Sequence, residues 1–304
     1  MRSLLLLLFT CFVFCSSFSQ RITAENYKQL KLMEPVLKNH SDSIINATTW
    51  FQRFNSDADL TKSLVMALKT PYSFYYPFDS VYMSTLYSPD SSFRIFTWQV
   101  MKDYSYYRQR GAIQMNTKDG SLKLFPLFDV SDFTDNPNDS IRDASRWIGA
   151  VYYKIVLKTF MNKNYYTLLG SDENNEKTNI KWIDILTFDN SGKPQFGRNC
   201  FTYPNDITKP KQPCYRFSLE FRKNGGVRIR YDEKLDVIIF DRLYSEGNDP
   251  RTKSTLIPYG EFEGFRWVNG KWQYTSTPFD ALDFEEKTEV FPKPFFEKPP
   301  KNKD

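Results

Sequence analysis

Five carboxylates near the ends of predicted strands have the chemistry to hydrolyse a glycosidic bond. They are Asp184, Asp232, Glu233, Glu261 and Glu263. The usual glycosidase mechanism needs two carboxyl groups about 5 to 10 Å apart across a cleft. Position along a chain does not give that distance, and acidic residues at strand ends commonly serve solubility alone. These residues therefore make a glycan-active hydrolase the alternative function, and none is assigned as catalytic.

Metal binding and nucleophilic catalysis have less support. Residues 172–176, Asp-Glu-Asn-Asn-Glu, place side-chain oxygens at alternate positions, as a calcium loop does. The turn glycine expected at the sixth position is Lys177, however, and the closing glutamate at the twelfth is Ile183. His40 is the single histidine, so a multi-histidine metal site is excluded and a Ser-His-Asp triad is not favoured. No GxSxG, HExxH, GxGxxG or Walker motif is present, and we predict no cofactor.

Cys200 and Cys214 are predicted to form a disulfide. They are the two cysteines outside the N-terminal 19 residues, and an oxidising compartment favours their pairing. The bond would close a proline-rich loop and contribute roughly 3 kcal/mol in the chain-entropy model. A metal or nucleophilic role is less favoured, because neither cysteine has a CxxC spacing or a nearby histidine.

The first 19 residues have the pattern of a cleavable signal peptide. Arg2 supplies positive charge, residues 4–13 are apolar, and Ser17-Phe18-Ser19 precedes the predicted cleavage before Gln20. The apolar run is shorter than the roughly 20 residues that a membrane-spanning helix needs. We therefore predict export to the periplasm or cell exterior, with no transmembrane segment after cleavage.

Residues 20–70 have a helical pattern, and residues 71–290 alternate as strands do. Pro35 interrupts the first predicted helix, Ser41 or Asp42 would cap a second, and Asp59 or Thr61 a third. Predicted strands follow at 93–100, 111–116, 122–128, 151–160, 165–169, 180–188, 235–243 and 262–274. Residues 140–148 are predicted to form a short helix, and helical signals are otherwise nearly absent from this part. We therefore predict a mainly-β fold, an antiparallel meander that forms a sandwich, a barrel or a curled sheet. Residues 291–304 form a tail rich in Pro and Lys.

The clearest local signal is a predicted hairpin. Residues 215–222 and 227–231 alternate apolar and polar around Lys223-Asn224-Gly225-Gly226, and Asn-Gly suits a tight turn. The pattern puts Arg216 on the solvent face. It buries four residues on one shared face: Phe217, Leu219, Val227 and Ile229.

Aromatic content and charge limit the range of partners. Aromatic residues make up 17% of the chain, with clusters at 72–78 and 104–107. If these clusters were exposed, they could stack on sugar rings or contact a protein partner. The favoured interpretation is that they are buried in the core of the β domain. The net charge of +5 is interleaved along the chain rather than clustered, which argues against nucleic acid as a partner.

Several segments together resemble a family of uncharacterised secreted β-rich proteins of Bacteroidota, over residues 71–274. The similarity is carried by residues 88–98, 153–157, 165–170, 183–188, 230–232 and 238–241. It implies an envelope or extracellular protein and transfers no catalytic residue. Asp-Ser-aliphatic triplets at Ser43, Ser80 and Ser140 are similar to O-glycosylation sites of exported proteins in that phylum. We expect a non-enzymatic secreted or periplasmic binding or envelope-associated protein, whose partner is an envelope protein or a glycan.

Overall fold

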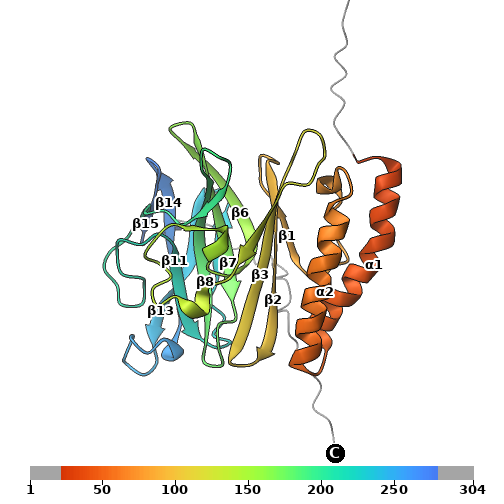
Figure 1. Ribbon diagram of the computed structural model, residues 1–304. Helices are drawn as coiled ribbons and strands as arrows, with labels where there is room; N and C mark the ends of the chain where they lie inside the picture. The colour runs from red at the N-terminus through yellow and green to blue at the C-terminus, as the bar shows by residue number, and fades with distance from the viewer. Residues whose placement is uncertain (1–21, 280–304) are drawn as a thin grey trace, which may run out of the picture.

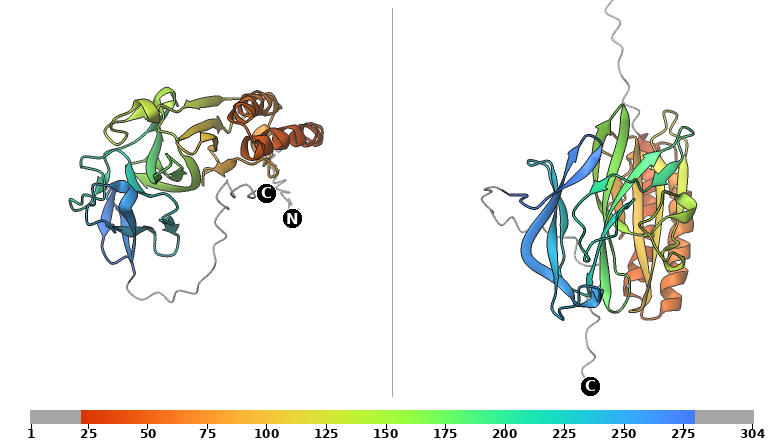
Figure 2. Two further views of the ribbon diagram at one scale, coloured as in Figure 1. Left: turned by 90° about the horizontal axis from the view of Figure 1, so that it is seen from below. Right: turned by 90° about the vertical axis from the view of Figure 1, so that its left-hand side faces the viewer.

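The computed structural model describes residues 22–279, which form a pair of helices followed by three stacked β-sheets (Figure 1). The helices are α1 (Ala24–Asn46) and α2 (Trp50–Leu68). The first sheet has the order β1-β2-β3-β4, with β1 (Ser84–Tyr87), β2 (Phe93–Asp103), β3 (Tyr106–Met115) and β4 (Leu124–Phe128). Figure 2 shows the helix pair at one end of the stack and the C-terminal strands at the other.

The second and third sheets complete the stack. The second has the order β5-β9-β8-β7-β6 with β11 added beside β8, and comprises β5 (Arg142–Asp143), β6 (Val151–Phe160), β7 (Lys163–Asp172), β8 (Thr178–Phe188), β9 (Pro194–Phe196) and β11 (Phe217–Arg222). The third has the order β10-β15-β14-β13-β12, and comprises β10 (Phe201–Thr202), β12 (Ile229–Asp232), β13 (Val237–Ser245), β14 (Leu256–Val268) and β15 (Lys271–Thr275). The predicted antiparallel, mainly-β fold after an N-terminal helical region is confirmed, and the described sheets form no closed barrel.

Two long helices replace the three that were predicted. Thr23 and Thr49 cap them, each accepting a hydrogen bond from a backbone N–H three residues ahead, at 3.2 and 3.3 Å. The Ser41 hydroxyl donates instead to the carbonyl of Lys38 at 2.8 Å, inside α1. Pro35 also lies within α1, so neither residue ends the helix.

The helix pair packs on the first sheet through an apolar core and a polar clamp. Leu37, Leu60 and Leu64 are buried against Phe96 and Trp98. The fully buried carboxylate of Asp57 on α2 accepts hydrogen bonds from Trp98 Nε1 and Arg110 Nε, both at 2.8 Å. These bonds join a helix to two strands and fix how α2 lies on the sheet.

The middle layers are buried on both faces, unlike the half-buried sheet expected from alternation. Phe93 and Ile95 face a core shared with the second sheet, whereas Phe96 and Trp98 face the helices. The other face of the second sheet packs on the third, where Ile183 and Phe240 share one core.

The predicted hairpin at 215–231 is wrong in its pairing. β11 pairs with β8 of the second sheet, and β12 pairs with β13 of the third. Asn224 and Gly226 do adopt positive φ, 59° and 72°, but the turn carries the chain from one sheet to the next. The burial is nevertheless as predicted, because the four apolar residues lie in one core: Phe217, Leu219, Val227 and Ile229.

Arg216 is fully buried, which corrects its predicted place on the solvent face. Its Nε lies 3.3 Å from Asp184 Oδ2, and its guanidinium donates to the carbonyls of Phe196, at 3.1 Å, and Pro137. Arg216 lies one residue before β11, so the alternation of faces within that strand does not govern its position. Arg216 therefore ties an irregular segment to the second sheet.

Four other predictions concern one local segment, the direction of strand pairing and the two ends of the chain. The helix expected at 140–148 is replaced by β5 and the short 3-10 turn η3 (Ala144–Arg146). The predicted meander also includes one short parallel pair, β10 with β15. The signal peptide at 1–19 and the tail at 291–304 lie outside the described residues.

Candidate binding pocket

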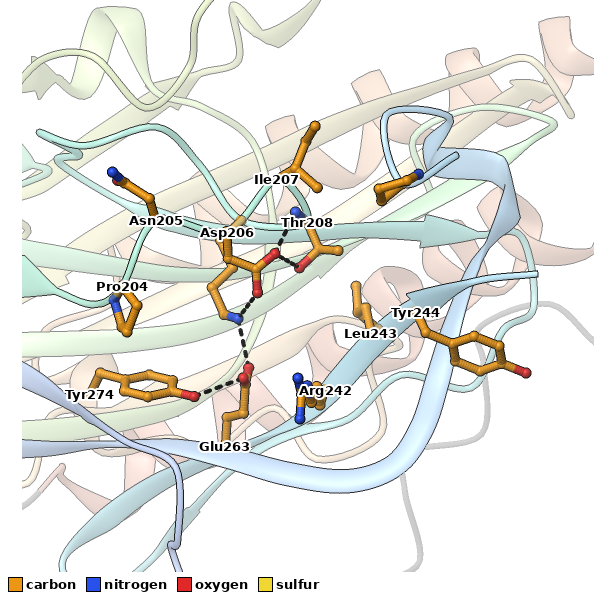
Figure 3. Close-up of a pocket in the computed structure, with 12 residues that line it drawn as sticks. Pro204, Asn205, Asp206, Ile207, Thr208, Arg242, Leu243, Tyr244, Glu263 and Tyr274 are labelled. Carbon is orange, nitrogen blue, oxygen red and sulfur yellow. Dashed lines mark hydrogen bonds and ion pairs between the residues drawn. The ribbon is translucent and has the colours of Figure 1, made fainter. Parts of the chain in front are cut away.

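An open pocket of about 460 Å³ lies between the third sheet and the segment that follows β10 (Figure 3). Its volume is in the range of small-molecule sites. Residues from the 204–209 segment, β13, the loop after it, β14 and β15 line it: Pro204, Asn205, Asp206, Ile207, Thr208, Lys209, Arg242, Leu243, Tyr244, Pro250, Glu263 and Tyr274.

Side-chain bonds hold the 204–209 segment in place. Asp206 Oδ1 accepts hydrogen bonds from the backbone N–H and the hydroxyl of Thr208, both at 2.8 Å, which forms a tight local turn. Lys253 Nζ, from the loop between β13 and β14, donates to the carbonyl of Ile207 at 3.0 Å. The pocket wall is therefore attached to both the sheet and the opposite loop.

The Lys209 cluster, formed by Lys209, Asp206, Glu263 and Tyr274, lies at the base of the pocket. The Lys209 ammonium contacts both carboxylates, with Nζ 2.8 Å from Glu263 Oε2 (Figure 3). The Tyr274 hydroxyl donates to Glu263 Oε1 at 2.9 Å. Because Lys209 and Glu263 have side chains only 3% and 6% exposed, their mutual charge compensation is required for burial.

The protonation of the cluster follows from these contacts. Burial alone would raise the pKa of Asp206, but hydrogen bonds from Lys209 and Thr208 hold it below its ordinary value. Burial, and then the neighbouring Glu263 carboxylate, raises the pKa of Tyr274 to about 12. At neutral pH Asp206 is thus ionised and Tyr274 is a neutral donor.

The rim of the pocket is an exposed ion pair beside two tyrosines. Arg242 Nη1 lies 2.8 Å from Glu261 Oε2, and both side chains are more than half exposed. The rings of Tyr244 and Tyr259 meet edge to face, with centroids 5.3 Å apart. Arg242 occupies the register break between Asp241 and Leu243 where β13 pairs with β14. Such a bulge re-aims side chains, here at the edge of the pocket.

The structure disperses the five carboxylates considered from the sequence. Glu263 lines the pocket and Glu261 lies at its rim. Asp184 is buried against Arg216. Asp232 accepts from two backbone N–H groups of the turn after β12, and Glu233 pairs with Lys154 at 2.7 Å.

Asp206 and Lys209 are residues of the site that the sequence did not predict. The Asp-x-Thr spacing of residues 206–208 predicts a local turn, but nothing in the sequence places Lys209 against Glu263, which lies on a distant strand.

No protein-family model, curated protein or solved structure matches this chain. The resemblance to secreted Bacteroidota proteins stays a prediction.

The candidate calcium loop uses its oxygens internally. Asp172 Oδ1 accepts from the backbone N–H of Asn174 at 2.8 Å and from Gln109 Nε2 at 2.7 Å. Glu173 pairs with Lys223, also at 2.8 Å. Burial raises the pKa of Asp172 to about 7, which disfavours the ionised form that a cation would need. Within residues 22–279, no group of three or more His, Cys, Asp or Glu side chains is arranged to hold a metal ion.

Cys200 and Cys214 are free thiols in this structure, so the predicted disulfide is not formed in it. Both lie buried in the core between the second and third sheets, and the Tyr203 hydroxyl lies 3.1 Å from Cys214 Sγ. Burial raises the pKa of Cys200 to about 12 and that of Cys214 to about 11. Both are therefore neutral thiols, and they flank the segment that carries half of the pocket.

The three candidate glycosylation serines differ in accessibility. Ser80 is exposed in a turn, whereas Ser43 lies within α1 and Ser140 is half-buried. The Ser43 Oγ accepts a hydrogen bond from Ser56 Oγ at 2.7 Å.

The first aromatic cluster, at 72–78, is largely core. Phe74 and Phe78 are buried, with the Arg94 guanidinium 5.6 and 5.3 Å from their ring centroids. Tyr104, in the second cluster, is 62% exposed at the tip of the turn between β2 and β3.

Proposed function

We propose that this chain is a non-enzymatic, exported binding protein that holds a small polar ligand in the pocket above the Lys209 cluster. The observation that carries the proposal is the Lys209 ammonium bound between Asp206 and Glu263 at the base of an open pocket. An ammonium held between two carboxylates can be nearly buried, and the cluster offers fixed hydrogen-bonding groups to a ligand.

The same contacts give less support to the alternative, a glycan-active hydrolase. A general acid in that mechanism is a carboxyl group whose pKa is raised, so that it holds a proton at neutral pH. The pKa of Asp206 is instead lowered, and the Lys209 ammonium lies between the two carboxylates where a substrate bond would have to enter. Binding is therefore the better supported role.

Export and disulfide formation belong to the same proposal. The apolar segment at 4–13, followed by Ser17-Phe18-Ser19, supports cleavage before Gln20 and a periplasmic or extracellular location. Among the described helices, none has the length and apolar character to cross a membrane. In an oxidising compartment Cys200 and Cys214 would pair, and the bond would close the loop that bears residues 204–209. The partner classes proposed are an envelope protein or a glycan.

A ligand screen with a blocked pocket tests the proposal. Thermal shift against amino acids, nucleotides, organic acids and oligosaccharides finds candidates, calorimetry measures their affinity, and chromatography follows any turnover. We expect a ligand that binds and is recovered unchanged. Asn205→Trp, which fills the pocket from an exposed position, should abolish binding, whereas Lys211→Trp, exposed on the same segment outside the lining, should not.

Two results would contradict the proposal. One is a ligand set that binds equally well to Asn205→Trp, or no ligand at all. The other is turnover of an oligosaccharide that is lost in Glu263→Gln, which would favour the hydrolase.

A further inference from the structure

We infer that the ligand of this pocket is an uncharged saccharide, an inference that rests on the proposed function. Among the described lining residues, both cations already face a carboxylate, the Lys209 ammonium fills the position that a cationic group of a ligand would take, and the remaining polar groups match hydroxyls.

Charge balance disfavours an anionic ligand. The lining carries two cations, Lys209 and Arg242, and each already has a carboxylate within 2.8 Å, Glu263 and Glu261 respectively. Phosphate, sulfate or uronate groups are usually bound by an arginine, whose guanidinium can donate two parallel hydrogen bonds, or by a lysine, which acts as a point charge. An anion at Lys209 would have to displace the buried Glu263 carboxylate, and an anion at Arg242 would have to compete with the exposed Glu261 carboxylate.

A cationic ligand is disfavoured because the protein supplies its own ammonium. Lys209 Nζ contacts Asp206 and Glu263 and lies 5.8 Å from the centroid of the Tyr274 ring. Two carboxylates beside an aromatic face are the groups that would recognise an amine. The Lys209 side chain occupies that position and is almost fully buried there.

Hydroxyl groups fit what remains. A hydroxyl both donates and accepts, so it suits a surface where donors and acceptors alternate. The carboxylates of Asp206 and Glu263 accept, Arg242 donates, and the Asn205 amide does both. Glu263 Oε2 is buried and, among the described residues, makes the ion pair with Lys209 but accepts no hydrogen bond of good geometry. Because this oxygen is enclosed by protein atoms, the carboxylate of the cluster that is open to a ligand hydroxyl is that of Asp206, whose side chain is 31% exposed.

The apolar part of the lining suits the C–H face of a sugar ring. Pro204, Leu243, Tyr244 and Pro250 line the same pocket as the polar groups. Tyr244 is 38% exposed, so its ring is available to a ligand, and its edge-to-face contact with Tyr259 limits its motion. An amphipathic ring with hydroxyls around its edge can use both kinds of surface at once.

The test compares matched saccharides by calorimetry on the full exported chain. The probes are neutral oligomers of glucose, mannose and xylose, acidic oligomers of galacturonate, and cationic oligomers of glucosamine. We expect at least one neutral oligomer to bind, with acidic and cationic ones at least tenfold weaker, which corresponds to about 1.4 kcal/mol. Tyr244→Ala should weaken neutral binding about tenfold, the size expected for one aromatic contact, while Tyr104→Ala, at an exposed tyrosine on the β2–β3 turn, should leave it unchanged.

The outcomes separate this inference from the proposed function. Binding of acidic or cationic oligomers alone, or of a non-saccharide ligand, in a manner blocked by Asn205→Trp overturns the inference and leaves the proposed function standing. Neutral binding that survives both Asn205→Trp and Tyr244→Ala overturns the inference by placing the sugar elsewhere. A failure of every ligand class, including those of the wider library, overturns both.

Discussion

Asp172 gives the sharpest prediction about stability, because it is a buried carboxyl that has no cationic partner within residues 22–279. Its Oδ1 accepts from the backbone of Asn174 and from Gln109, yet burial raises its pKa from 3.8 to about 7. Asp172→Asn keeps an oxygen for both donors and adds an amide. Gln109 Oε1, buried and without a hydrogen-bond partner among the described residues, is an acceptor beside it.

The size and sign of the effect follow from the two pKa values. Between pH 4 and pH 7 the unfolded chain has ionised at Asp172 while the folded chain keeps its proton, so the free energy of unfolding falls as pH rises and levels off above about pH 7. At about 1.4 kcal/mol per pKa unit, the total cost at pH 8 is about 4 kcal/mol. About 3 kcal/mol of it develops between pH 5 and pH 8.

Urea denaturation at pH 5 and pH 8 measures this difference directly. Relative to wild type, Asp172→Asn should gain about 3 kcal/mol more at pH 8 than at pH 5. Glu176→Gln, at an exposed glutamate of the same loop, should follow the wild-type pH dependence. Equal changes in the free energy of unfolding for Asp172→Asn and wild type between the two pH values would contradict a raised pKa at Asp172.

Three further predictions concern the core. Phe217→Ala should lower the free energy of unfolding by about 3 to 5 kcal/mol in chemical denaturation, because it empties a fully buried aromatic site. A loss below about 1 kcal/mol would mean that this core is not packed as described. Arg216→Ala should cost about 3 to 5 kcal/mol, since it leaves the buried Asp184 carboxylate unpaired. Arg230→Ala should cost far less, because the Arg230 side chain is about one-third exposed. Equal costs for the two substitutions would contradict the buried ion pair. The reduced, folded protein should react slowly with thiol reagents, because burial keeps Cys200 and Cys214 protonated. The exported form should have no titratable thiol when it is unfolded without reductant. Two titratable thiols in that experiment would rule out the disulfide.

Local pattern predicted most of the elements but not their partners. Strands expected at 93–100, 151–160 and 180–188 correspond to β2, β6 and β8, since apolar alternation and β-branched content are properties of each segment alone. The turn at 223–226 was recognised for the same reason. That β11 and β12 belong to different sheets depends on contacts with β8 and β13, which no local signal encodes.

The site was less accessible from the sequence than the fold. Glu263 was among the candidates because acidic residues near strand ends are conspicuous, but its partner Lys209 comes from an irregular segment before β11. Arg216 was wrongly predicted to face solvent, because alternation predicts the face of a residue only within a strand. The residue type alone does not distinguish a buried arginine from an exposed one. The pocket exists through the packing of a loop on a sheet, which is tertiary information.

The most direct test of the binding role is NMR shift mapping of the ¹⁵N-labelled exported protein with the tightest ligand from the screen. We expect the largest amide shift changes at residues 205–209, 242–244 and 263, around the Lys209 cluster. Shift changes centred on another surface, or no change at ligand concentrations that saturate binding by calorimetry, would contradict it.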